Sequence, residues 1–91
     1  MKARLLRIQG RVQGVGYRDW LVGEATAAGL MGWVRNRADG TVEALLAGEE
    51  AAVGAVLLAA RRGPPAARVD LIEERFAELP EEPGFQRKPT L

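Results

Sequence analysis

Residues 10–18, with the sequence Gly-Arg-Val-Gln-Gly-Val-Gly-Tyr-Arg, hold the groups in this chain best suited to bind an anion. Gly14 and Gly16 lack a Cβ atom, so they can adopt positive φ angles and let an oxyanion approach the main chain closely. Arg18 adds a guanidinium, whose planar fork matches two phosphoryl oxygens in a way that the point charge of a lysine cannot. The stretch therefore indicates a phosphate site made of loop amides and one arginine.

A glycine-rich connection between a strand and a helix can also be only a turn, and turn chemistry alone leaves both interpretations open. Two familiar phosphate motifs are absent from this stretch. No G-x-x-x-x-G-K-[ST] sequence occurs, and Gly14-x-Gly16 is followed by Asp19 where the dinucleotide fingerprint has a third glycine. A phosphate site here would depend on neither motif.

The elements on either side of this stretch follow from the spacing of apolar residues. Leu6, Ile8 and Val12 alternate with polar residues, which predicts a half-buried strand over roughly residues 3–12. Helical spacing then predicts a helix over roughly residues 18–28 that ends at Gly29. Its apolar stripe consists of Tyr17, Trp20, Leu21, Ala25 and Ala28. Because the first N–H groups of a helix have no partner within it, unpaired donors are expected where the loop ends.

The middle of the chain predicts a pair of strands followed by a second helix. The strands are expected over residues 31–36 and 41–47, and the Asp39-Gly40 pair between them is a strong signal for a type I′ hairpin turn. From Glu49 the apolar spacing is helical again, and a Gly-Pro-Pro sequence that starts at residue 63 ends this helix.

A fourth strand is expected over residues 68–76. Val69 and Leu71 share one face of this strand whereas Ile72 and Phe76 fall on the other, so we expect a β-bulge near Leu71. The order of strand, helix, strand, strand, helix, strand predicts an α+β fold with the split βαβ arrangement. In that arrangement two helices pack on one face of an antiparallel sheet.

The motif at residues 10–18 closely resembles that of the acylphosphatase family, and further family landmarks follow in the expected order. They are Gly32-Trp-Val-Arg-Asn36, Asp39-Gly-Thr-Val-Glu43, Gly63-Pro64 and Ala67-x-Val69. The resemblance covers nearly the whole chain and weakens after Phe76. It implies one domain over residues 1–91 with a ferredoxin-like sandwich. Such a domain hydrolyses the carboxyl-phosphate anhydride of acyl phosphates without a metal or another cofactor.

The resemblance also implies the role of each residue in the site. Arg18 matches the arginine that binds the phosphate, and Asn36 matches the asparagine that positions the attacking water. The phosphate-binding residues are then Gln13, Gly14, Val15, Gly16, Tyr17 and Arg18. Tyr17 stands where phenylalanine is common in the family, which is a small departure because both side chains are aromatic.

The chain after Leu79 is rich in proline and charge. Composition alone would leave this segment as a loose, disordered terminus. The resemblance implies instead that residues 85–87 return to the sheet as a short fifth strand.

Asn36 has a second interpretation, because asparagine is common where a turn opens and residues 36–40 are expected to form one. In the split βαβ arrangement, however, the first strand is central and the second strand runs parallel to it with one strand between them. Asn36, near the end of the second strand, would then lie at the same end of the sheet as residues 13–18. Spacing alone does not exclude the turn, but together with the family resemblance this topology favours a role in the site.

Asp19 is the one carboxylate beside the loop that could act as a base. An acidic side chain in the first turn of a helix interacts favourably with the helix dipole, and a carboxylate touching a phosphate would repel it. We therefore expect Asp19 to stabilise the helix rather than to take part in catalysis.

Composition restricts the classes of partner. The 91 residues carry 13 basic and 12 acidic side chains, and a net charge of +1 predicts no nucleic-acid partner. Cysteine is absent, so no disulfide or thiol chemistry is expected and a cytoplasmic location suits the chain. The longest uncharged run of the second helix, residues 51–60, is too short to span a membrane, so no membrane partner is expected. We expect a monomer, although the sequence does not determine the oligomeric state.

Two other functions remain open. The same order of elements serves RNA-recognition modules, but the central strands here present charged and polar side chains instead of an aromatic platform. The chain could also be a non-catalytic domain that binds phosphate or a similar anion, or a partner domain that keeps the fold without the chemistry. Because Arg18 and Asn36 are both present, the sequence favours a hydrolase of small acyl phosphates.

Overall fold

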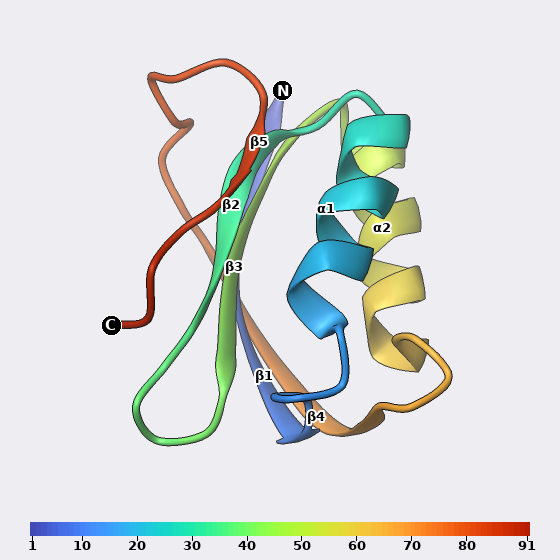
Figure 1. Cartoon of the computed structure of the whole chain (residues 1–91). Coiled ribbons are helices and arrows are strands. Elements are labelled where there is room, and N and C mark those ends of the chain that lie inside the picture. The colour runs from blue at the N-terminus through green and yellow to red at the C-terminus, as the bar shows by residue number, and fades with distance from the viewer.

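The computed structural model describes residues 1–91. The chain folds into a five-stranded sheet with two helices on one face (Figure 1). The elements are β1 (Lys2–Arg11), α1 (Tyr17–Ala27), β2 (Met31–Asn36), β3 (Val42–Gly48), α2 (Glu50–Arg62), β4 (Arg68–Phe76) and β5 (Phe85–Arg87). This is the predicted ferredoxin-like order, followed by the fifth strand that the resemblance implied. Neither helix is long and apolar enough to cross a membrane.

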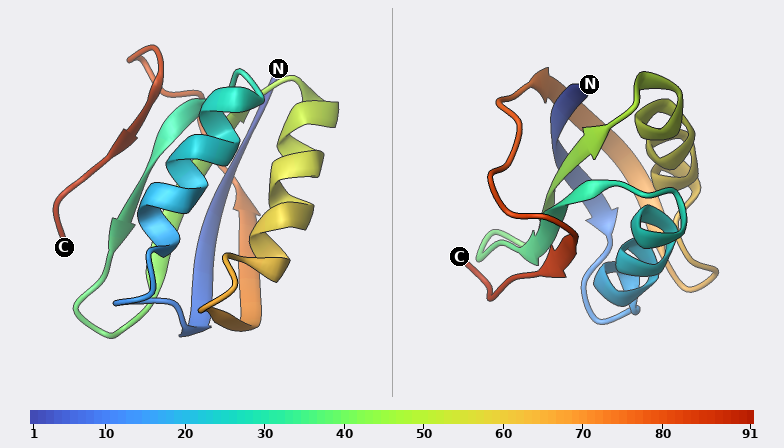
Figure 2. Two further views of the ribbon diagram at one scale, coloured as in Figure 1. Left: turned by 45° about the vertical axis from the view of Figure 1, so that its right-hand side comes forward. Right: turned by 90° about the horizontal axis from the view of Figure 1, so that it is seen from above.

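The strand order in the sheet is β4-β1-β3-β2-β5 (Figure 2). β1 pairs antiparallel with β3 and β4, and β2 pairs antiparallel with β3, whereas β2 and β5 are parallel. The expected antiparallel sheet is confirmed for the first four strands, and β5 makes the complete sheet mixed. Since β1 and β2 both pair antiparallel with β3 between them, they run in the same direction and end at the same edge of the sheet.

The hydrophobic core lies between the inner face of the sheet and the two helices. Leu6 and Ile8 of β1 are fully buried there, as their alternation predicts. The other core positions come from the rest of the sheet, the two helices and the adjoining loops, and are Val12, Tyr17, Leu21, Ala25, Leu30, Val34, Val42, Ala44, Leu46, Val53, Val56, Ala60 and Ile72. This packing determines where the first turn of α1 meets the end of β1.

The outer face of the sheet is partly covered by the chain itself. Residues 77–84 leave β4 and pass over this face to reach β5, on the side opposite the helices (Figure 2). Leu45 and Ala47 are buried under this cover, beside Ala3 and the half-buried Trp33. β3 is therefore buried on both faces, and the proline-rich end of the chain is ordered where composition alone suggested a loose terminus.

The apolar stripe of α1 is shorter than predicted. Tyr17, Leu21 and Ala25 are buried, but Ala28 is exposed. Ala28 lies one residue past the last helical residue, where its N–H donates to the Glu24 carbonyl at 3.2 Å and closes the helix end. The helix therefore ends before Ala28 can face the core.

The turn between β2 and β3 is not the predicted type I′ hairpin. A type I′ turn needs positive φ at both central residues, but no residue other than glycine has positive φ in this chain. Five residues connect the strands instead, and the Arg37 N–H donates to the Thr41 carbonyl over 2.8 Å. The Asp39 carboxylate accepts hydrogen bonds from the Thr41 hydroxyl and N–H at 2.7 and 3.0 Å. This side-chain turn replaces the tighter backbone turn.

The predicted bulge in β4 is confirmed. Gln9 pairs with Leu71 and Gly10 pairs with Val69, so Asp70 is the extra residue. The extra residue brings Val69 and Ile72 to the core side. A Cβ atom on Gly10 would lie 2.1 Å from the Arg68 carbonyl oxygen, so this close strand pairing requires glycine.

Candidate active site

The loop between β1 and α1 carries a row of unpaired backbone donors. Gly14 and Gly16 have φ angles of 72° and 78°, the left-handed conformation that glycine adopts without strain. No backbone N–H from residue 13 to residue 18 donates a hydrogen bond to a protein acceptor. Successive free N–H groups at a helix N-terminus are suited to surround an anion.

A pocket of about 200 Å³ opens over this loop. It is lined by Val12, Gln13, Gly14, Gly16, Tyr17, Arg18, Asp19, Asn36 and Arg87. All the predicted site residues except Val15 line it, and the Val15 side chain packs against the hydrophobic core instead. Val15 can therefore contribute only its backbone N–H.

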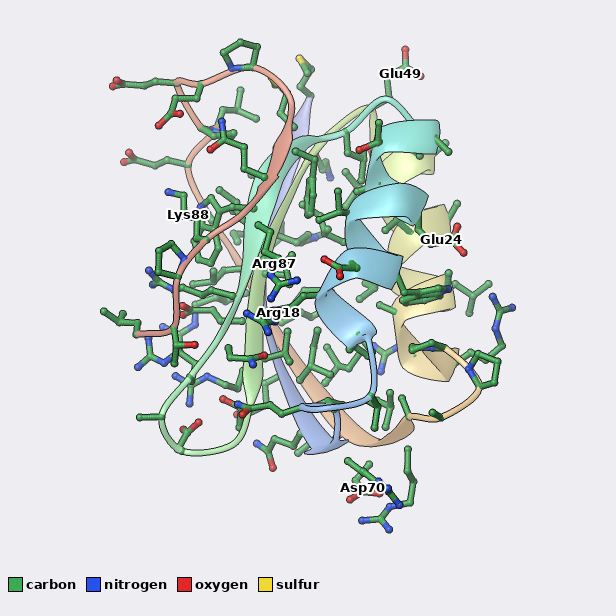
Figure 3. All side chains as sticks on the ribbon, viewed as in Figure 1. Arg18, Glu24, Glu49, Asp70, Arg87 and Lys88 are labelled. Carbon is green, nitrogen blue, oxygen red and sulfur yellow. The ribbon has the colours of Figure 1, made fainter.

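Arg18 has no protein partner for its guanidinium. It forms no ion pair and no hydrogen bond with another side chain, although six other arginines of this chain are each paired with a carboxylate. Figure 3 shows Arg18 at the start of α1, next to Arg87. The whole fork of Arg18 is available to an anion in the pocket.

The Asn36 side chain is an exception to the pairing of polar atoms. Its Oδ1 is the only buried side-chain oxygen or nitrogen in the chain without a hydrogen-bond partner. Asn36 is the last residue of β2 and lies in the strand, before the turn begins. Buried polar atoms are nearly always paired, so an unpaired acceptor in a residue that lines the pocket points to a ligand or water as its partner.

Two contacts hold the backbone next to Asn36. The Gln13 amide donates from Nε2 to the Arg37 and Thr41 carbonyls at 2.8 and 2.9 Å, which joins the loop to the β2–β3 turn. The Leu91 N–H donates to the Asn36 carbonyl at 3.1 Å. Both side-chain N–H groups of Gln13 are thus used within the protein, and only its backbone N–H is free for an anion.

Arg87 lines the pocket, and sequence reasoning missed it. Its Nη1 donates to Asp19 Oδ1 over 2.7 Å, from the strand β5 that lies beside β2. The one signal in the sequence was an arginine at the end of the short strand that the resemblance implied. Without the parallel pairing of β5 with β2, nothing connected this residue to the loop.

The environment of the Asp19 carboxylate argues against a catalytic role. Its side chain is 74% exposed and forms an ion pair with Arg87. The residue is also the acidic residue of the first turn of α1, where the helix dipole favours it. Both features agree with the expectation that Asp19 stabilises the helix.

No group of three or more His, Cys, Asp or Glu side chains in the chain is placed to hold a metal ion.

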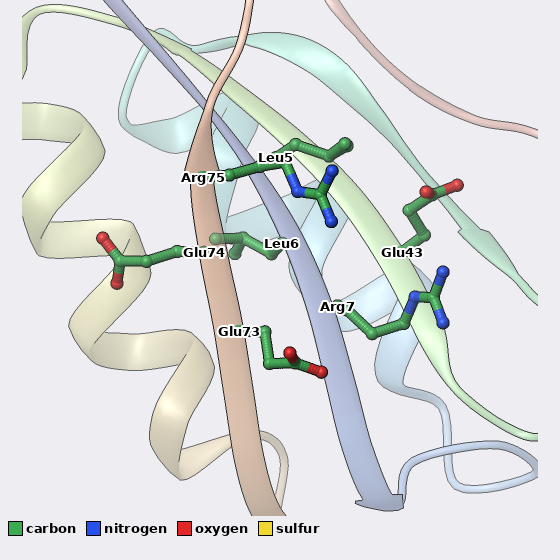
Figure 4. A pocket seen from close by; sticks show the side chains of 7 residues that line it. All are labelled: Leu5, Leu6, Arg7, Glu43, Glu73, Glu74 and Arg75. Carbon is green, nitrogen blue, oxygen red and sulfur yellow. The ribbon is translucent and has the colours of Figure 1, made fainter.

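A second polar hollow, of about 310 Å³, lies on the outer face of the sheet (Figure 4). Arg7, Glu43, Glu73 and Arg75 line it from β1, β3 and β4. Glu43 is itself paired, accepting from Arg35 on the neighbouring strand at 2.7 Å. This hollow has no glycine loop, and its three carboxylates, Glu43, Glu73 and Glu74, would repel an anion. The pocket over the β1–α1 loop is therefore the candidate active site.

Comparison with known proteins identifies the family of this chain. The sequence matches the acylphosphatase family over residues 5–87. A relative from Rhodospirillum rubrum named acylphosphatase is 59% identical over 91 residues and covers 100% of both chains. Another, from Acidiphilium cryptum, is also named acylphosphatase and is 59% identical over 90 residues, covering 99% of both chains.

The fold is also similar to that of a solved structure. The crystal structure of acylphosphatase from Bacillus subtilis superimposes with a TM-score of 0.93 at 36% identity, over 97% of this chain and 99% of that chain. The resemblance to the acylphosphatase family is thus confirmed in sequence and in structure. This chain belongs to the acylphosphatase family.

Proposed function

We propose that this family member, a hydrolase of the carboxyl-phosphate anhydride of acyl phosphates, performs the reaction in the pocket over the β1–α1 loop. Arg18 and the backbone N–H groups of residues 13–18 hold the phosphate, and Asn36 positions the attacking water. The observation that carries the proposal is that Asn36, whose buried Oδ1 has no hydrogen-bond partner, lines the same pocket as the free fork of Arg18.

The substrate's leaving group explains why so few side chains suffice. An acyl phosphate expels a carboxylate, whose conjugate acid has a pKa of about 4–5, judged from side-chain carboxyls. Such a group leaves as the anion near neutral pH. No general acid is needed, in agreement with a pocket that contains no histidine or cysteine.

The remaining task is to hold charge and to place the nucleophile. The transition state of phosphoryl transfer is loose, with negative charge on the non-bridging oxygens. The loop amides and the Arg18 fork donate to these oxygens. Asn36 Oδ1 accepts a hydrogen bond from the water. This bond directs a lone pair of the water oxygen at phosphorus, in line with the bond between phosphorus and the leaving carboxylate oxygen. The proton of the water passes to a phosphoryl oxygen of the substrate, so Asp19 is not required as a base.

The same reasoning defines the partners that we propose. They are a small acyl phosphate as substrate and inorganic phosphate, or a similar anion, as a competing ligand of the loop. We further propose that residues 1–91 act as one domain and a monomer. A cytoplasmic location is proposed because a chain without cysteine suits a reducing compartment.

Release of phosphate from acetyl phosphate, measured in the presence of a chelator, tests the proposal. Wild type is expected to release many equivalents of phosphate per protein, whereas Arg18→Ala and Asn36→Ala with native circular dichroism are not. A wild-type protein that binds phosphate but releases no more than one equivalent would be a non-catalytic anion-binding domain. Full activity in either variant would show that the roles given to these two residues are wrong.

A further inference from the structure

The pocket contains a second cation that the proposed phosphate site does not use. Arg87 pairs with Val34 in the register of β5 and β2, and its guanidinium reaches across to the first turn of α1. Figure 3 shows Arg87 and Arg18 near one another between β5 and α1, whereas Lys88 extends to the other side of the sheet. Two guanidinium groups therefore face one small pocket.

Most of the Arg87 fork is free. Nη1 donates to Asp19 Oδ1, and no other guanidinium nitrogen of Arg87 bonds to a protein atom. The side chains of Arg87 and Asp19 are 45% and 74% exposed. An ion pair so exposed contributes little to stability, but it holds the guanidinium at the mouth of the pocket.

The pocket has an inner wall and a rim. The glycine loop and Asn36 form the inner wall, and the exposed Arg87–Asp19 pair forms the rim. At about 200 Å³ the pocket is smaller than the roughly 300–1,000 Å³ of typical ligand sites. If the phosphate of a substrate binds against the inner wall, its acyl group must therefore extend out of the pocket past Arg87 and Asp19.

We infer that Arg87 is a specificity-determining residue that contacts the acyl half of the substrate and favours acyl groups with an anionic group of their own. This inference rests on the proposed function. A carboxylate on the acyl group can accept hydrogen bonds from the free nitrogens of Arg87 while Asp19 keeps Nη1 in place. An uncharged acyl group of the same length gains nothing from these donors.

Two matched substrates test the inference. Succinyl phosphate and butyryl phosphate both have four-carbon acyl groups, but only the first ends in a carboxylate. In wild type kcat/KM is expected to be higher for succinyl phosphate. Arg87→Gln is expected to lower the ratio of the two kcat/KM values by about tenfold, the effect of one hydrogen bond to a charged group, with the larger loss on succinyl phosphate.

Lys88→Gln is the matched control. It removes the same charge from the adjacent residue, but the Lys88 ammonium lies over the Trp33 ring, 5.3 Å from its centroid and outside the pocket. The ratio is expected to stay at the wild-type value in this variant. If Lys88→Gln lowered the ratio as much as Arg87→Gln, the preference would come from net charge and the inference would be overturned.

A binding measurement separates this inference from the proposed function. Succinyl phosphonate and butyryl phosphonate, analogues that are not hydrolysed, are titrated calorimetrically into wild type and Arg87→Gln. A preference for the succinyl analogue that Arg87→Gln removes supports the inference even in a protein without turnover. If Arg87→Gln weakens both analogues equally, or neither, Arg87 acts on the phosphate or only on α1, and the inference is wrong even if hydrolysis is confirmed.

Discussion

The Tyr17 hydroxyl donates a hydrogen bond of 2.7 Å to the Ala60 carbonyl, and this bond ties the first turn of α1 to the last turns of α2. Tyr17→Phe leaves the ring in place but leaves the buried carbonyl without this donor. We expect the free energy of unfolding to fall by about 1–2 kcal/mol, measured by urea denaturation. Phosphate release should stay close to that of wild type, because the hydroxyl points into the core; a large loss of turnover would contradict this.

Burial raises the pKa of the Tyr17 hydroxyl far above its usual value. Its ionisation is therefore easier in the unfolded chain, whose tyrosine titrates near pH 10. The contribution of the neutral hydroxyl to stability is fully present below about pH 10 and is lost progressively as the pH rises above that value. The difference in stability between wild type and Tyr17→Phe should accordingly shrink between pH 9 and pH 11.

Arg18→Ala is expected to reduce kcat/KM by a factor of about 10³ or more, the range found for arginines that stabilise a phosphoryl transition state. The fold should be unaffected, because the Arg18 guanidinium makes no hydrogen bond or ion pair that the variant would break. Arg62→Ala serves as the control, since Arg62 is an exposed arginine without an ion pair. Equal losses in both variants would contradict the role given to Arg18.

Asn36→Ala should separate activity from stability. Removing the aligned acceptor is expected to lower kcat by about 10²–10³. Because Oδ1 is buried without a partner, its loss should leave the free energy of unfolding unchanged or slightly higher. Parallel measurement of turnover and of denaturant midpoints checks both parts; a marked loss of stability would show that Asn36 is a structural turn residue.

Asp39 should make the stability of the protein depend on pH in the acid range. The hydrogen bond from the Thr41 hydroxyl, aided by the Thr41 N–H and by Arg7 and Arg37, lowers the pKa of its carboxyl. Its contribution is present above the unfolded pKa of about 3.9 and is lost as the pH falls through the lower folded value. Wild type should be more stable than Asp39→Ala at pH 6, and the difference should vanish at low pH, as thermal melts can test.

The first four strands and both helices could be predicted to within about a residue because apolar side chains repeat with clear periods over each element, whereas β5 was implied only by the family resemblance. The two wrong details have local causes. The turn at Asp39 depends on a side chain that bonds to the backbone two residues ahead, which competes with the backbone turn that the Asp-Gly pair favours. Ala28 continues the helical spacing, but the helix has already ended when the chain reaches it.

The site was predictable where the motif is contiguous and unpredictable where the fold assembles it. Residues 13–18 could be identified in one stretch, and the β1–β3–β2 topology brought Asn36 to them. Arg87 could not be assigned, because its position depends on a three-residue strand that follows an irregular crossing of the outer face. The hydrogen bonds from the Gln13 amide to the β2–β3 turn could not be predicted from residue spacing either, because the acceptors are backbone carbonyls.

The extra residue in β4 also affects how the sheet meets other chains. β4 forms one border of the sheet, and an uninterrupted border strand offers a template to which a foreign strand can add. Asp70 breaks the regular ladder of that border and carries a charge at the break, while the opposite border, β5, is only three residues long. Neither border offers a long regular run of free main-chain groups, so the sheet is protected against the edge-to-edge association that leads to aggregation.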